Sequence, residues 1–154
     1  LIWAGPLGLA LCGLQFWASR DAALMAGLIA SPRALWLLPV ALGFSFITAG
    51  FTEEFFFRGF LQGRLYRAFG RAWPAILITS LLFGAYHLPY AYMNPRWPSH
   101  GDWRAAFGAA FGQGVPGGLI LGVVFHRSRG NLFAPVTVHA LINLFPIALS
   151  FARH

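Results

Sequence analysis

The feature that most constrains this 154-residue chain is a series of long stretches without Asp, Glu, Lys or Arg. There are five of them, covering residues 1–19, 34–52, 72–95, 105–125 and 130–152. A membrane-spanning helix needs about 20 predominantly apolar residues, so each stretch is long enough to cross a bilayer. Because lipid cannot satisfy backbone polar groups, such stretches form helices rather than open strands. The sequence therefore predicts an all-α fold, a polytopic transmembrane helix bundle with about five spanning helices.

The overall composition points the same way. The chain is 58% hydrophobic and 10% charged, whereas a soluble domain is about 45–50% apolar and about 25% charged. These values exclude a water-soluble globule, and the length favours a single transmembrane domain over residues 1–154. The apolar segment Ala22–Ala30 is too short to span a bilayer, so it is predicted to be a short interfacial helix.

The positive charge is of the kind that anchors a membrane protein. All 11 cationic side chains are arginines, and most flank the uncharged stretches. Such arginines meet lipid head groups, whereas a nucleic-acid site needs cations clustered on one face. The predicted partners therefore include membrane lipid and no nucleic acid. Abundant Arg, Ala and Gly without Lys are typical of GC-rich bacterial genomes, which favours a multi-pass protein of the bacterial cytoplasmic membrane.

Five polar side chains interrupt or adjoin the apolar stretches. Glu53 and Glu54 follow the second stretch, His87 lies in the third, and His139 and Asn143 lie in the fifth. An ionisable side chain at membrane depth costs roughly 2.5–3.5 kcal/mol on insertion scales, so it indicates a functional role by default. We therefore treat this set as the candidate site.

A hairpin places two of these side chains at one depth. The second helix is predicted to continue to Phe69 and to end at Gly70. Glu53 lies seventeen residues before Gly70, and His87 lies seventeen residues after it. At 1.5 Å per residue, both lie about 25 Å from the bend. A carboxylate and an imidazole facing each other there form a proton-handling pair.

The spacing along the second helix separates the two carboxylates. Glu54 and Arg58 are four residues apart with Glu first, the favourable order for a helical ion pair. Neighbouring residues of an α-helix point about 100° apart, so Glu53 is left to face His87. A purely structural ion pair between Glu54 and Arg58 is the alternative interpretation.

The fifth stretch brings a second pair of polar groups. His139 and Asn143 are four residues apart, so one helix face presents both an imidazole and an amide. Two such donors suit a carbonyl oxygen on which negative charge develops. The alternative for His139 is an interhelical hydrogen bond.

Three motifs contain these residues in order: Glu53-Glu54-x-x-x-Arg58, Phe83-x-x-x-His87 and His139-x-x-x-Asn143. Together they resemble the CPBP (CAAX protease and bacteriocin-processing, ABI) intramembrane protease family, which includes the type II CAAX prenyl endopeptidases. The resemblance covers about residues 38–145, and residues 1–33 are interpreted as an accessory helix and an interfacial turn.

The resemblance implies an intramembrane endopeptidase that hydrolyses a peptide bond. Glu53 and His87 would then activate a water, and His139 and Asn143 would stabilise the oxyanion. The implied supporting residues are Glu54, Arg58 and Phe83. The implied substrate is a peptide or protein, lipidated or embedded in the membrane.

Cofactor use and function class each have an alternative. The similarity to prenyl endopeptidases favours glutamate without a cofactor, and no compact H-E-x-x-H zinc motif is present. Zinc is the alternative, with the candidate ligands Glu53, Glu54, His87 and His139.

A non-catalytic membrane immunity or scaffold protein that binds a peptide is the first alternative function. A small proton-coupled transporter is the second, although no repeat or pair of broken helices is evident in the sequence.

Overall fold

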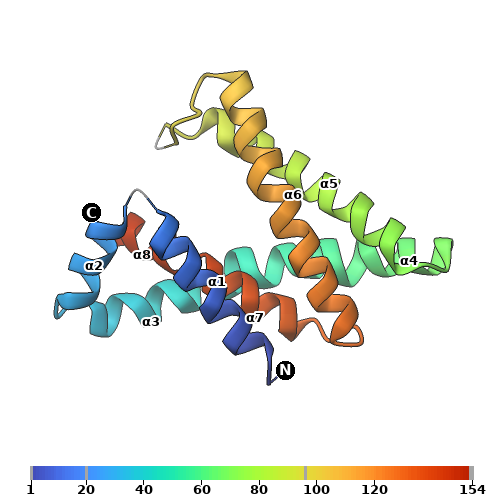
Figure 1. Cartoon of the computed structure of the whole chain (residues 1–154), viewed down its shortest axis with the longest axis horizontal. Helices are drawn as coiled ribbons and strands as arrows, with labels where there is room; N and C mark the ends of the chain where they lie inside the picture. Colours follow the sequence, from blue (N-terminus) through green and yellow to red (C-terminus); the bar gives the residue numbers. More distant parts are fainter. Residues whose placement is uncertain (1, 20, 96, 153–154) are drawn as a thin grey trace. The chain divides into compact units, whose positions relative to one another are not determined.

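A computed structural model describes residues 2–19, 21–95 and 97–152, and these residues form only helices and their connections (Figure 1). The elements in order are α1 (Ala4–Ala18), α2 (Ala22–Ala30), α3 (Ala34–Ser45), η1 (Phe46–Glu53), η2 (Phe55–Gln62), α4 (Gly63–Phe69), α5 (Ala72–Met93), α6 (Trp103–Arg127), α7 (Phe133–Ile142) and α8 (Leu144–Ala152). The all-α prediction is confirmed, and the predicted short helix is α2.

The chain is an integral membrane protein with several candidate spans. Within the described residues, Ala34–Phe69, Ala72–Met93 and Trp103–Arg127 are long and apolar enough to cross a membrane. The bent pair α7 and α8 makes a fourth if it is counted as one span. The sequence predicted about five spans, so the count is lower. The first stretch forms a helix of only 15 residues.

The fifth apolar stretch is broken rather than continuous. Helices α7 and α8 meet at Asn143 with a bend of 44°. Pro146 has no N–H to donate to the Ile142 carbonyl four residues earlier, and its ring crowds that carbonyl. Helix α7 ends at Ile142, which this constraint explains, and Pro146 is tolerated because it lies in the first turn of α8.

The second stretch forms one long segment with an unusual winding. It is helical from Ala34 to Phe69, and Gly70 follows with a φ of 63°, so its predicted end is confirmed. Its middle portion, η1 and η2, is π-helical. π-Helical turns are rare and occur frequently at functional sites.

Contacts divide the molecule into two compact units. The first unit contains the residues up to Phe55 together with those from Asn131 onward, and the second contains Phe56–Gly130. In the first unit, α1 packs against α7, where a Cβ on Gly8 would lie 3.2 Å from the Val138 Cα. Helix α3 packs against α8 around an apolar core of Met25, Leu28, Leu37, Ala41, Ala148 and Leu149.

The second unit is built on a close contact between α5 and α6. A Cβ on Gly114 would lie 2.8 Å from the Cα of Gly84, and one on Gly118 would lie 2.9 Å from the Cα of Ser80. Small residues at this spacing let two membrane helices approach backbone to backbone. The contact thereby fixes α5, which carries His87, against α6.

Adding one methyl group to this contact is expected to destabilise the protein. The substitution Gly118→Ala places a Cβ against backbone that cannot move aside cheaply, and such overpacking costs about 1–3 kcal/mol. Gly117→Ala is the matched control, because a Cβ there meets nothing within 4 Å and alanine favours a helix. Thermal unfolding in detergent should show a lower midpoint for Gly118→Ala alone. Equal midpoints for the two variants would contradict the close contact.

Candidate active site

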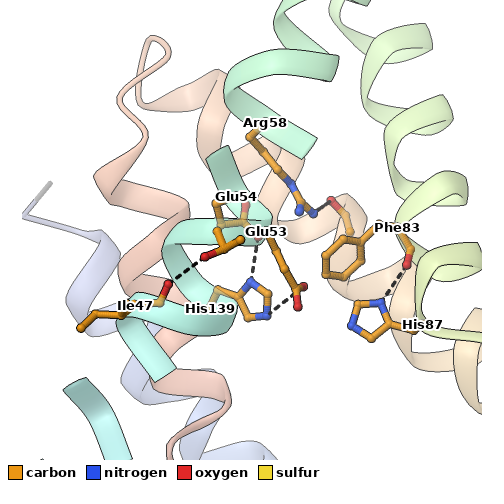
Figure 2. Close-up of polar contacts among 9 residues, drawn as sticks. Ile47, Glu53, Glu54, Arg58, Phe83, His87 and His139 are labelled. Carbon is orange, nitrogen blue, oxygen red and sulfur yellow. Dashed lines mark hydrogen bonds and ion pairs between the residues drawn. The ribbon is translucent and has the colours of Figure 1, made fainter. Parts of the chain in front are cut away.

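The first unit brings a buried carboxylate against an imidazole. His139 of α7 donates a hydrogen bond from Nδ1 to Glu54 Oε1 at 2.8 Å (Figure 2). The Glu54 side chain is 0% exposed, and it lies between η1 and η2. A carboxylate is an acceptor in such a bond, so Nδ1 carries the proton. This hydrogen bond fixes both the orientation and the tautomer of the His139 ring.

The second carboxylate lies at the other nitrogen of the same ring. Glu53 Oε2 is 4.0 Å from His139 Nε2, and the Glu53 side chain is 17% exposed (Figure 2). This is an ion-pair distance rather than a hydrogen bond, and one water molecule can contact both atoms across it. The imidazole is therefore flanked by two carboxylates, one at each ring nitrogen.

The π-helical winding explains why both carboxylates reach one histidine. An α-helix would turn neighbouring side chains about 100° apart, but a π-helix has more residues per turn and a smaller angular step. Gly50 lets η1 approach α7 closely, since a Cβ there would lie 3.1 Å from the Val136 carbonyl oxygen. The α-helical prediction assigned Glu53 and Glu54 to different partners, whereas in the structure both lie next to His139.

Asn143 lies one turn after His139, at the end of α7. Its backbone N–H donates to the His139 carbonyl at 3.1 Å, and its side chain is half-buried. The helical spacing of four residues therefore holds between them, but the helix ends there instead of continuing. The role of Asn143 toward an oxyanion stays a prediction.

The second unit holds the other motif residues in contact with one another. Arg58 is 1% exposed, donates from Nη2 to the Gly118 carbonyl at 3.1 Å, and lies 4.4 Å from the Phe83 ring centroid. His87 Nδ1 lies 2.8 Å from the Phe83 carbonyl oxygen, and the two rings are 4.6 Å apart (Figure 2). Phe83 therefore contacts both Arg58 and His87.

The tautomer of His87 follows from that contact. A carbonyl oxygen only accepts hydrogen bonds, so Nδ1 carries the proton when it donates to Phe83. In the neutral ring, Nε2 then has the acceptor lone pair that a general base requires.

The predicted site residues thus fall into two groups. Glu53, Glu54, His139 and Asn143 belong to the first unit, and Arg58, Phe83 and His87 belong to the second. The pairings Glu53–His87 and Glu54–Arg58 each join the two units and stay predictions. For zinc, no group of three or more His, Cys, Asp or Glu side chains within residues 2–19, 21–95 and 97–152 is arranged to hold a metal ion.

One buried polar residue was missed by the sequence interpretation. Gln62 is 4% exposed and donates from Nε2 to the Gly122 carbonyl at 3.0 Å. The sequence does contain a pattern that indicates its burial. Glu54, Arg58 and Gln62 are spaced four residues apart, which is the spacing of residues on one helix face. All three are buried, whereas Phe55, Phe56 and Phe60 of the same segment are exposed, as lipid-facing residues are.

Comparison with known protein families shows which family the chain belongs to. A family model described as type II CAAX prenyl endopeptidase Rce1-like matches residues 34–145, which is well over half of the chain. The chain belongs to this family. The match begins at the first residue of α3, contains all three motifs and leaves out α1 and α2. No curated protein and no solved structure matches the chain.

Membership in the Rce1-like family places the chain among the CAAX-type proteases of the membrane. It implies a substrate that is a peptide or a prenylated protein in the membrane. The apolar helices long enough to span a bilayer agree with that location.

Proposed function

We propose that this chain is a glutamate-dependent intramembrane endopeptidase. In this proposal, Glu53 and His87 activate a water that attacks a peptide carbonyl, and His139 and Asn143 stabilise the resulting oxyanion. The observation that carries the proposal is the placement of His139 between Glu54 and Glu53, with Nδ1 bonded to one carboxylate and Nε2 4.0 Å from the other.

The proposed reaction begins with the transfer of a proton from water to Glu53. Glu53 accepts a proton from water while the water oxygen bonds to the carbonyl carbon, and the carbonyl electron pair moves onto its oxygen. His139 and Asn143 donate hydrogen bonds to that oxygen as its charge grows. When the tetrahedral intermediate collapses, the C–N bond breaks and the departing amine receives the proton. General base catalysis of this kind contributes about 10²–10⁴-fold.

Glu54 acts in this scheme as a positioning residue. Its carboxylate accepts the Nδ1 proton of His139 and thereby holds the ring with Nε2 directed away from Glu54. When both ring nitrogens of His139 carry protons, Nδ1 donates to Glu54 and Nε2 is left to donate to the oxyanion. The buried position of Glu54 strengthens that interaction, because water does not screen it.

Arg58 and Phe83 are proposed to support His87. The Phe83 carbonyl accepts from His87 Nδ1, which directs Nε2 to the opposite side of the ring. Arg58 lies over the Phe83 ring and is tied to α6 through Gly118. These contacts restrict the motion of α5 where the proposed catalytic imidazole is attached.

Cleavage of a defined peptide library by the purified chain tests the proposal. We would incubate the detergent-solubilised protein with membrane peptides, each with and without a prenylated cysteine, and identify products by mass spectrometry. Products from the wild type but not from Glu53→Gln support the peptidase. Peptide binding without products from either protein would instead support the immunity or scaffold function. Proton flux in proteoliposomes without cleavage would support the transporter.

Cleavage is expected to survive removal of divalent metals. The proposed water is activated by a carboxylate and an imidazole, so dialysis against EDTA followed by assay with 1,10-phenanthroline should leave the rate within about twofold of the untreated value. Restoration of a lost rate by added Zn²⁺ would instead establish the zinc alternative. A zinc-dependent peptidase assayed in parallel confirms that the chelators are effective.

A further inference from the structure

A pocket in the second unit is lined by none of the proposed catalytic residues. It has a volume of about 360 Å³ and lies where α4, the start of α5 and the end of α6 come together. The lining residues that matter here are Gln62, Tyr66, Phe125, His126 and Arg129. Helix α5 begins at Ala72 and helix α6 ends at Arg127. Both are candidate spans, so the pocket lies at the ends of two membrane-crossing helices, where head groups are found.

Arg129 occupies a backbone position that ordinarily takes glycine. It follows the end of α6 with a φ of 58°, its N–H donates to the His126 carbonyl, and the Gly130 N–H donates to the Phe125 carbonyl. These are the two hydrogen bonds of a Schellman helix end, whose left-handed residue is usually glycine. Within the described ranges, no other residue except glycine has a positive φ. The fold accepts this strain at a position where the arginine lines the pocket.

Gln62 supplies a second, independent indication of a ligand. Its side chain is buried, and its Nε2 donates to the Gly122 carbonyl at 3.0 Å. Its Oε1 is also buried and has no hydrogen-bond partner among the residues that the structure describes. Buried acceptors without a partner are rare. The pocket therefore combines cationic and imidazole donors from Arg129 and His126 with one acceptor that requires a donor.

We propose that this pocket binds a phosphodiester whose alcohol carries a free hydroxyl, supplied by an anionic membrane lipid of the phosphatidylglycerol type. The phosphate lies against Arg129 and His126, since arginine binds phosphate in a bidentate manner. A headgroup hydroxyl donates to Gln62 Oε1. The lipid is the favoured source because the pocket lies at the ends of the spans, with further arginines nearby in sequence at positions 67 and 71.

The key variant is Arg129→Gly, which removes the guanidinium and supplies the residue that the left-handed position prefers. The helix end is therefore expected to be retained. The matched control, Arg127→Gln, removes the same charge from an exposed residue of α6 that does not line the pocket. Native mass spectrometry of the full chain, given equal amounts of phosphatidylglycerol and phosphatidylcholine, measures the lipid preference of each protein.

The wild type should prefer phosphatidylglycerol, and Arg129→Gly should lower that preference about tenfold, the effect of losing one hydrogen bond between charged groups. The preference of Arg127→Gln should stay within about twofold of the wild-type value. Equal losses in the two variants would overturn the proposal, because they would indicate general attraction of the lipid to surface charge.

Two further arms test the headgroup and its source. Phosphatidylmethanol has the same charge without the hydroxyl, so the wild type should bind it more weakly than phosphatidylglycerol. Equal binding would overturn the assignment of the hydroxyl to Gln62. Soluble glycerol 1-phosphate should not displace the bound lipid. Displacement by that ester at millimolar concentration would overturn the lipid as the source.

Discussion

Replacing Glu53 with glutamine is expected to lower peptide cleavage by the purified chain about 10²–10⁴-fold, the usual contribution of a general base. Glutamine has nearly the same shape but cannot accept the proton of the attacking water. Since Glu53 is only 17% exposed and lies beside His139, bulk water does not readily take its place. The loss should fall on kcat, with peptide binding retained.

The matched control for this variant is Asp102→Asn, the same carboxylate-to-amide change at a different place. Asp102 caps α6 by accepting from the Arg104 and Ala105 backbone N–H groups, and asparagine is an equally good cap. Its cleavage rate should equal that of the wild type. If Glu53→Gln kept more than about a tenth of the wild-type rate, the base assigned here would be wrong.

Replacing His139 with alanine is expected to reduce both activity and stability. The loss of one oxyanion donor lowers kcat by about 10²–10³-fold. The same change removes the imidazole that donates to the buried Glu54 carboxylate, and breaking a buried charged pair costs about 3–5 kcal/mol. Cleavage rates and the free energy of unfolding in detergent measure the two effects on the same sample.

The double variant His139→Ala with Glu54→Gln separates these effects. Because the buried negative charge is now absent, we expect a substantial part of the lost unfolding free energy to return. Cleavage should stay at the level of the single variant, since no oxyanion donor has been restored. A double variant no more stable than His139→Ala would show that the two side chains do not form an energetically coupled pair.

The helix boundaries near the site could be predicted where local chemistry sets them. Gly70 has a left-handed backbone conformation with a φ of 63°, which glycine adopts without strain. The end of the second helix at Phe69 was therefore predictable from the sequence. The bounds of the helix Ala22–Ala30 were also predictable, because Asp21 precedes the apolar segment and Ser31-Pro32 follows it. The break at Asn143 was not predicted, because residues 130–152 carry no charge and are long enough for one span, although Pro146 lies within them.

The convergence of two carboxylates on His139 could not be predicted from periodicity. The amino-acid pattern around Glu53 and Glu54 fits an ordinary α-helix, in which neighbours diverge by about 100°. π-Helical winding depends on tertiary contacts, such as the close approach of Gly50 to α7. Nothing in the local sequence specifies that approach. The motifs contain Glu53, Glu54 and His139, which lie together in the first unit, but the arrangement of these three side chains was not predictable.

The proposal depends most on one spatial relation, that Glu53 and His87 act on the same water. Cross-linking of cysteines at these two positions by a short bifunctional methanethiosulfonate reagent tests it directly, because side chains that share a water lie too far apart for a direct disulfide. Cys12 is changed to alanine so that no other cysteine is present. Ile47→Cys paired with His87→Cys is the control, because Ile47 lies on the exposed surface of the same segment. We expect this reagent to cross-link positions 53 and 87 rapidly in the membrane, and to give little cross-linking from position 47. A cross-link from position 47 but not from position 53 would contradict it.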